Sequence, residues 1–175
     1  MKLFIGIGLV VLSLVLGAFQ EQVKININSN LSHVPHIMNY DGLTPELRRE
    51  AVKIRLTAIP YNYYHSHQKI DLLYHLDSKG LYYSKWLLTV VLVFLHFCLG
   101  HNIITQLIST EPNLKKAYTY IYVLAFGLAV GAYAIGKLVG LDFYPFSRRV
   151  VGFLQSVIPV VFVFFISKLN VHAVK

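Results

Sequence analysis

The chain has 175 residues, of which 55% are hydrophobic and only 14% charged, against about 25% charged in ordinary soluble domains. The deficit is confined to four stretches without Asp, Glu, Lys or Arg, at residues 3–19, 86–110, 117–136 and 150–167. Each is close to the ~20 apolar residues that a membrane-spanning helix needs. The composition therefore excludes a soluble globular domain, a disordered acidic tail and a disulfide-stabilised scaffold, and it predicts an integral membrane protein.

The charges favour a lipid bilayer as a partner and argue against nucleic acid. Lys and Arg outnumber the acids 16 to 8. Many of the basic residues cluster at the ends of apolar stretches, where such side chains reach phosphate headgroups; they are Lys2, Lys85, Lys115, Lys116, Lys137, Arg148, Arg149 and Lys168. The single cysteine, Cys98, excludes a disulfide within the chain and a zinc site built from several thiolates.

Residues 1–19 have the features of a secretory signal: one lysine, an apolar core, and small residues (Gly17 and Ala18) at the end. A cut after Ala18 would place the large Leu16 at the third position back, which is unfavourable. We expect a retained signal-anchor, with a cleaved signal peptide as the alternative. In both cases the segment directs the following residues across the membrane.

Residues 20–85 form the only sizeable polar region, which we expect to be a small extramembrane cap. The apolar residues of 23–28 alternate, which predicts a short strand. Thr44 and Pro45 predict a helix start, with an end at Pro60. The apolar face of this helix should consist of Leu47, Ala51, Ile54 and Ala58, with Arg48, Arg49, Lys53 and Arg55 off it. A second short helix is expected over residues 68–76, closed near Gly80.

Residues 86–175 hold the other three apolar stretches, joined by short connections that make neighbouring spans antiparallel. The predicted fold is an all-α integral membrane bundle of four transmembrane helices, or three if the first is a cleaved signal, with the mostly helical cap between helices 1 and 2. The flanking positive charges are almost balanced and do not decide the orientation. The signal-like start favours a cytoplasmic amino terminus, which would put residues 20–85 on the periplasmic side.

The string Tyr61-Asn62-Tyr63-Tyr64-His65-Ser66-His67 is the most unusual in the chain. The spacing of His65 and His67 can supply two metal ligands, with His75 or the His33/His36 pair as further partners. The alternative, which we favour, is that these amphipathic rings lie along the membrane interface.

Several polar residues lie within the predicted spans, where such groups usually face the bundle interior; they are His96, His101, Asn102 and Gln155. Cys98 and His101 are three residues apart, so a thiol activated by imidazole is conceivable. We favour hydrogen bonding between helices instead. In the fourth span Pro159 should bend the helix and leave a carbonyl for a neighbour to satisfy.

The third span carries small residues four apart, which allow close helix association in lipid; they include Gly127, Gly131 and Gly136. We expect a packing face there, within the bundle or against a partner. Arg148 and Arg149 precede the fourth span. Paired arginines can bind a carboxylate or phosphate in bidentate fashion, although they more often anchor a helix at headgroups.

The run from residue 143 to 159, Phe-Tyr-Pro-Phe-Ser-Arg-Arg-Val-Val-Gly-Phe-Leu-Gln-Ser-Val-Ile-Pro, resembles the small integral membrane proteins encoded beside exosortases in Gram-negative bacteria. By layout the resemblance covers residues 81–168. It implies an accessory role beside a membrane-embedded sorting transpeptidase or protease. Those enzymes work through a cysteine, an arginine and a histidine at the outer face, a set that this chain does not reproduce because Cys98 lies at membrane depth.

The resulting hypothesis is a non-enzymatic accessory subunit of the bacterial cytoplasmic membrane, without a cofactor, that binds a larger, exosortase-type membrane protein. The alternative is a small membrane enzyme or metal-binding protein that uses His65, His67 and His75. A transporter or channel subunit is the weakest reading, because no acidic residue lies within the four apolar stretches.

Overall fold

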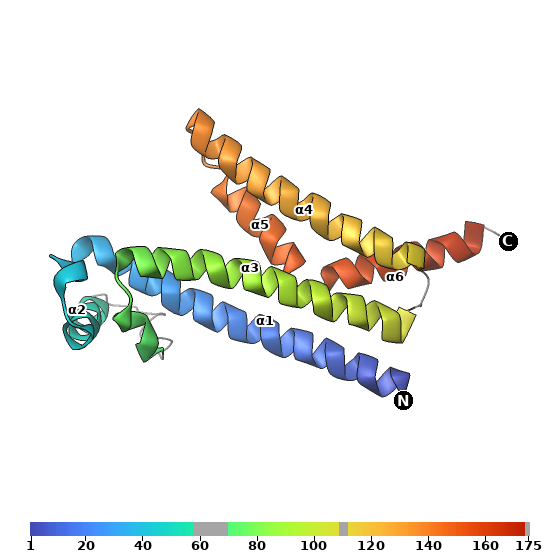
Figure 1. Ribbon diagram of the computed structural model, residues 1–175, viewed down its shortest axis with the longest axis horizontal. Helices are drawn as coiled ribbons and strands as arrows, with labels where there is room; N and C mark the ends of the chain where they lie inside the picture. The colour runs from blue at the N-terminus through green and yellow to red at the C-terminus, as the bar shows by residue number, and fades with distance from the viewer. Residues whose placement is uncertain (58–69, 109–111, 174–175) are drawn as a thin grey trace. The chain divides into compact units, whose positions relative to one another are not determined.

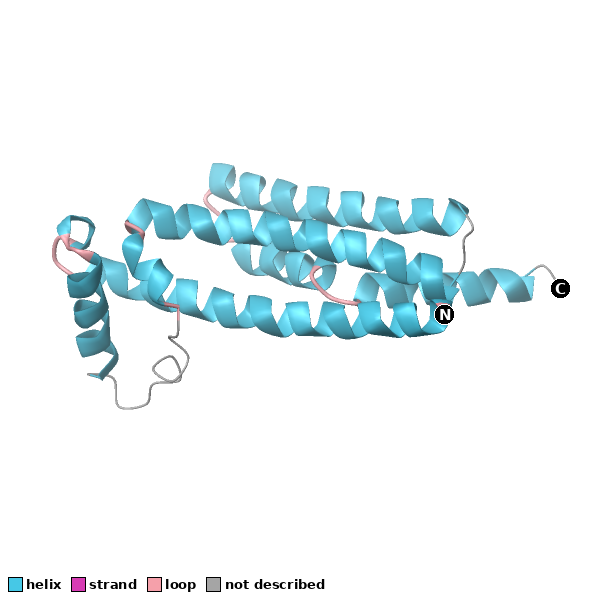
Figure 2. Cartoon of the chain, turned by 60° about the horizontal axis from the view of Figure 1, so that its bottom comes forward, coloured by secondary structure: helices cyan, strands magenta, loops and turns pink. Residues whose placement is uncertain are grey.

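The computed structural model describes residues 1–57, 70–108 and 112–173, and these residues contain helices and connections but no strand (Figures 1 and 2). The predicted all-α class is confirmed. The α-helices are α1 (Lys2–His33), α2 (Pro45–Thr57), α3 (Ser78–Ile103), α4 (Pro112–Val139), α5 (Tyr144–Leu154) and α6 (Ile158–Ala173). The short elements are the 3-10 helices η1 (Val34–His36), η2 (Tyr40–Gly42) and η3 (Asp71–His75), and the π-helix η4 (Ile104–Ile108).

Three helices are long and apolar enough to cross a membrane: Lys2–His36, Ser78–Ile108 and Asn113–Val139. The pair Tyr144–Leu154 and Ile158–Ser167 meets the same criterion jointly but is bent by 63°, so the count rises to four if the pair is one broken span. The predicted bend in the last apolar stretch is thus confirmed. The bend coincides with an interruption of the helix over residues 155–157.

The chain divides into two compact units, which we describe separately. The bundle unit comprises residues 1–17 and 91–175, and the cap unit comprises residues 18–90. Both α1 and α3 contribute residues to each of them.

In the cap unit, the predicted strand at residues 23–28 is wrong, because α1 continues through it to His33. Extending an existing helix is cheaper than starting a new element. The side chains also support the helix: the Asn26 amide donates to the carbonyl of Gln22 (2.8 Å), and the Asn30 amide donates to the carbonyl of Asn26 (3.0 Å). Ile27 is buried in the core of the cap.

The start of α2 is as predicted, with the backbone N–H of Leu47 directed at the Thr44 hydroxyl (3.4 Å). The predicted buried face is wrong. Leu47 and Ile54 are 50% and 69% exposed, whereas Arg48 and Val52 are 7% and 0% exposed. Arg48 is buried because its guanidinium can bind backbone carbonyls that a leucine would leave unsatisfied, as shown below.

The second cap helix expected over residues 68–76 is wrong as well. Of that range, residues 68–69 lie outside the described residues, and only Asp71–His75 form a short 3-10 helix. Gly80 closes no helix but lies in the first turn of α3, where its N–H donates to the carboxylate of Asp77 (2.6 Å).

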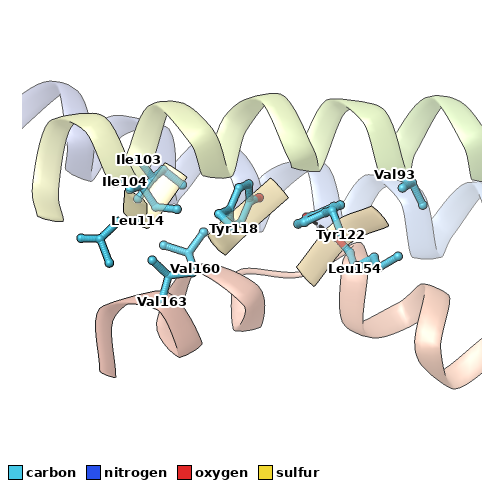
Figure 3. Packing of buried hydrophobic residues seen from close by; sticks show 9 residues of the cluster. All are labelled: Val93, Ile103, Ile104, Leu114, Tyr118, Tyr122, Leu154, Val160 and Val163. Atoms are coloured by element: carbon cyan, nitrogen blue, oxygen red, sulfur yellow. Dashed lines mark hydrogen bonds between the residues drawn. The ribbon is translucent and has the colours of Figure 1, made fainter. Parts of the chain in front are cut away.

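The core of the bundle unit gathers side chains from α3, η4, α4, α5 and α6 (Figure 3). Its buried members are Val93, Ile103, Ile104, Leu114, Tyr118, Tyr122, Leu154, Val160 and Val163. α5 packs against α4, and α6 packs against both α4 and η4. Tyr118 and Tyr122 of α4 therefore share a core with α5 and α6, the two parts of the interrupted last span.

Candidate functional site

α4 has two faces of different character. The face toward the core carries Tyr118, Tyr122 and Ala129, which are at most 4% exposed. Gly127 follows Tyr118 by nine residues, or about two and a half turns, so it lies on the opposite side of the helix. A Cβ added at Gly127 or Gly131 would meet nothing within 4 Å. These two glycines thus lie on a face of α4 with open space at their Cβ positions, which we call the outward face of α4.

Large apolar side chains flank the two glycines on the outward face. Leu124 and Leu128 are 71% and 55% exposed, and Val123 and Val130 are 62% and 51% exposed. Glycines between larger residues allow the backbone of another helix to approach closely in lipid. The outward face therefore has the composition of a helix-docking surface.

Gly136 does not share this face. A Cβ there would lie 2.7 Å from the carbonyl oxygen of Leu141 and 3.2 Å from Phe143, so the glycine makes room for the α4–α5 turn. The turn is closed by a hydrogen bond from the N–H of Leu141 to the carbonyl of Gly136 (2.9 Å), with Gly140 at φ +72°. This is the Schellman arrangement that ends many helices at a left-handed glycine. Gly136 is thus a packing residue within the chain.

Arg148 and Arg149 are exposed in the first half of α5, next to the buried Ser147. The Ser147 hydroxyl donates to the carbonyl of Phe143 (3.1 Å) and holds the first turn of this helix. The aromatic residues around the turn, Tyr144 and Phe146, are partly exposed. Cations beside exposed aromatic rings are typical of a membrane–water interface.

Polar groups inside the bundle unit bind backbone carbonyls. The Tyr118 hydroxyl donates to the carbonyl of His96 (3.2 Å), and the Tyr122 hydroxyl donates to the carbonyl of Leu154 (2.6 Å). These two bonds link α4 to α3 and to the end of α5. Sequence reasoning missed both tyrosines, although their four-residue spacing on the face of Leu114 was a usable signal.

Two of the predicted intramembrane polar residues, His96 and Asn102, make hydrogen bonds within α3, where we favoured bonds between helices. His96 is buried, and its Nδ1 lies 2.9 Å from the carbonyl of Leu92, which assigns the proton to Nδ1. The Asn102 amide donates to the carbonyl of Cys98 (2.8 Å). Gln155 is 3% exposed, at the end of α5.

The ring of His101 packs among aromatic side chains. Its centroid lies 5.9 Å from that of Phe97 and 6.3 Å from that of Tyr118. Phe97 in turn stacks on Tyr118 at 5.7 Å. These contacts give His101 a packing role.

The histidine cluster is only partly within the described residues. His65 and His67 lie outside them, and His75 is exposed at the end of η3. Among the described residues, no group of three or more His, Cys, Asp or Glu side chains is arranged to hold a metal ion.

The cap unit contains a buried cation that sequence reasoning placed on the solvent side. The guanidinium of Arg48 donates to the carbonyls of Tyr40 (3.0 Å), Tyr74 (3.2 Å) and Asp41 (2.9 Å). It also lies 5.1 Å from the centre of the Tyr40 ring, a favourable cation–π distance. Arg48 thus ties α2 to η2 and η3.

Asp41 adds a second long-range link in the cap. Its carboxylate accepts hydrogen bonds from the hydroxyl and the backbone N–H of Ser78, both at 2.7 Å. These bonds, the hydroxyl first, lower the pKa of Asp41. Because Ser78 is the first residue of α3, the negative charge also complements the helix dipole.

Comparison of the chain with protein-family models, curated proteins and solved structures gives no match.

Proposed function

We propose that this chain is a non-enzymatic accessory subunit of a membrane complex, which docks on a larger membrane protein through the outward face of α4. One observation carries the proposal: a Cβ added at Gly127 or Gly131 would meet nothing within 4 Å among the described residues, although the two glycines have the spacing that packs helices in lipid. The internal packing of α4 uses other residues, among them Tyr118 and Ala129.

The polar residues of the bundle unit support a structural role. The hydroxyls of Tyr118 and Tyr122 and the amide of Asn102 donate to main-chain carbonyls of the same chain. A catalytic nucleophile or base would instead need to be aimed at another side chain or at a substrate. These groups stabilise the fold, and we assign partner binding to the outward face of α4.

The partner class that we propose is the exosortase-type sorting enzyme, which rests on the resemblance of residues 143–159 to exosortase-associated proteins. We place the chain in the bacterial cytoplasmic membrane, with four spans of which α5 and α6 form the last, and with residues 20–85 on the periplasmic side. Arg148 and Arg149 then contribute to binding at the outer interface.

The test is co-purification from membranes in which the tagged chain is produced together with an exosortase-type enzyme. Replacing Gly127→Leu and Gly131→Leu should reduce recovery of the enzyme at least tenfold, because the added side chains hold the partner helix away. The matched control is Gly8→Leu with Gly17→Leu, two α1 glycines that also have nothing within 4 Å. Equal recovery with both double variants, or no recovery with the natural sequence, would refute the proposal.

A further inference from the structure

The interruption between α5 and α6 has its backbone groups satisfied by dedicated side chains. The Ser156 hydroxyl donates to the carbonyl of Phe153 (2.6 Å) and accepts from the N–H of Ile158 (3.2 Å). From another helix, the Tyr122 hydroxyl donates to the carbonyl of Leu154 (2.6 Å). Unsatisfied backbone groups are costly at membrane depth, so these bonds are what makes the bend stable.

The carbonyl of Leu154 has two possible donors. In a continuous helix it would accept from the N–H four residues later, which belongs to Ile158. In the bent form that N–H is bound by Ser156, and Tyr122 occupies the carbonyl. Straightening would therefore replace the bonds of Tyr122 and Ser156 with one bond from the N–H of Ile158. The Leu154 carbonyl accepts a hydrogen bond in both forms.

Pro159 limits the free-energy difference between the bent and the straight form. It is fully buried, and it has no N–H to donate to the carbonyl of Gln155, so a straight helix would still lack one bond. This lowers the advantage of the straight form and leaves Tyr122 and Ser156 as the groups that favour the bent one.

We propose that residues 155–157 form a two-state joint in which the Tyr122 hydroxyl is the latch that holds the bent state. Release of the latch allows α5 and α6 to become one straight helix, which changes the packing of α6 against η4 and α4. The joint lies entirely within the bundle unit, and the inference does not depend on the proposed docking partner.

The test measures the distance between spin labels on α5 and α6 by pulsed electron resonance. Labels are attached through Phe146→Cys and Phe165→Cys, two exposed positions, in full-length Cys98→Ala protein in lipid nanodiscs. A continuous helix spans about 28 Å between them. The 63° bend shortens this by about 4 Å.

We expect one short distance with Tyr122 and Ser156 present. Tyr122→Phe combined with Ser156→Ala should add a population about 4 Å longer, with the ratio of straight to bent shifted roughly tenfold, because a buried carbonyl loses its partner. Tyr120→Phe is the control: it removes the same hydroxyl group from the same helix, but at a side chain that is 64% exposed. It should leave the distance unchanged.

Pro159→Ala provides an independent arm, because it restores the missing N–H without touching the latch, and it should also populate the long distance. If the latch variant does not fold, this arm decides. Only the short distance in every folded variant would show a fixed kink and overturn the proposal. An equal shift with Tyr120→Phe would overturn the role of Tyr122.

Discussion

Both units bury polar donors, and both direct them at backbone carbonyls, but the donors that join separate elements differ in charge. The bundle unit uses the neutral hydroxyls of Tyr118 and Tyr122, whereas the cap unit uses the guanidinium of Arg48. A charged side chain at membrane depth is costly. A side-chain hydrogen bond to the backbone of another element is therefore made by a neutral group in the apolar spans and by a cation in the polar region.

The largest expected effect comes from removing the buried cation. Arg48→Met should destabilise the cap by about 3–5 kcal/mol, because three carbonyls lose a charged donor. Hydrogen exchange of the α2 and η3 amides in nanodiscs measures the loss.

The matched control is Arg49→Met on the same helix. Arg49 makes an exposed ion pair with Asp71 at 3.6 Å, and exposed pairs contribute at most about 1 kcal/mol. Equal effects of the two substitutions would contradict the contrast between a buried and a surface cation.

A smaller loss is expected from overpacking the tyrosine in the bundle. A Cβ at Gly100 would collide with the Tyr118 hydroxyl oxygen and would lie 3.0 Å from Val160. Gly100→Ala should therefore cost about 1–3 kcal/mol, measured as the midpoint of denaturation in mixed micelles.

Gly127→Ala is the comparison for this substitution, because it adds the same methyl group at an open position. It should be neutral or slightly stabilising, since alanine is the better helix former. A large loss from Gly127→Ala would mean that the outward face is in fact packed.

The smallest effect concerns pH and Asp41. Its folded-state pKa is lowered by the bonds from Ser78, so its contribution is present above the unfolded-state pKa and is lost as the pH falls through the folded-state pKa. The protection of the first backbone amides of α3 against hydrogen exchange, corrected for the intrinsic exchange rate, should decline in that acidic range.

Asp41→Asn should remove that acid-dependent change in protection. Asp142→Asn is the control, because Asp142 accepts from the N–H of Tyr144 (3.1 Å) in the other unit. If Asp41→Asn leaves the acid-dependent change intact, the carboxylate is not what responds to pH.

The sequence was sufficient for the apolar helices, the start of α2 and the bend near Pro159, because each depends on local composition. It was insufficient where residues distant in the chain determine the secondary structure or the burial of a side chain. The alternation at residues 23–28 is a strand pattern, but the helix that precedes it continues. Arg48 is charged, yet carbonyls from Tyr40 and Tyr74, far apart in the chain, draw it inside.

The candidate site was predictable to the same degree. The spacing of Gly127 and Gly131 predicted a packing face, which stays a prediction, whereas Gly136 shares their small size but serves the turn after α4. Which glycine faces outward depends on which side Tyr118 and Tyr122 occupy, and that is set by the other helices of the bundle.

The central claim, docking through the outward face of α4, is tested most directly by photo-crosslinking in native membranes. A crosslinking amino acid at position 127 should join the chain to a larger membrane protein, identified by mass spectrometry as an exosortase-type enzyme. The same amino acid at position 129, where alanine is 2% exposed, should give only crosslinks within the chain. Crosslinks to lipid alone from position 127, or the same partner from both positions, would contradict the account.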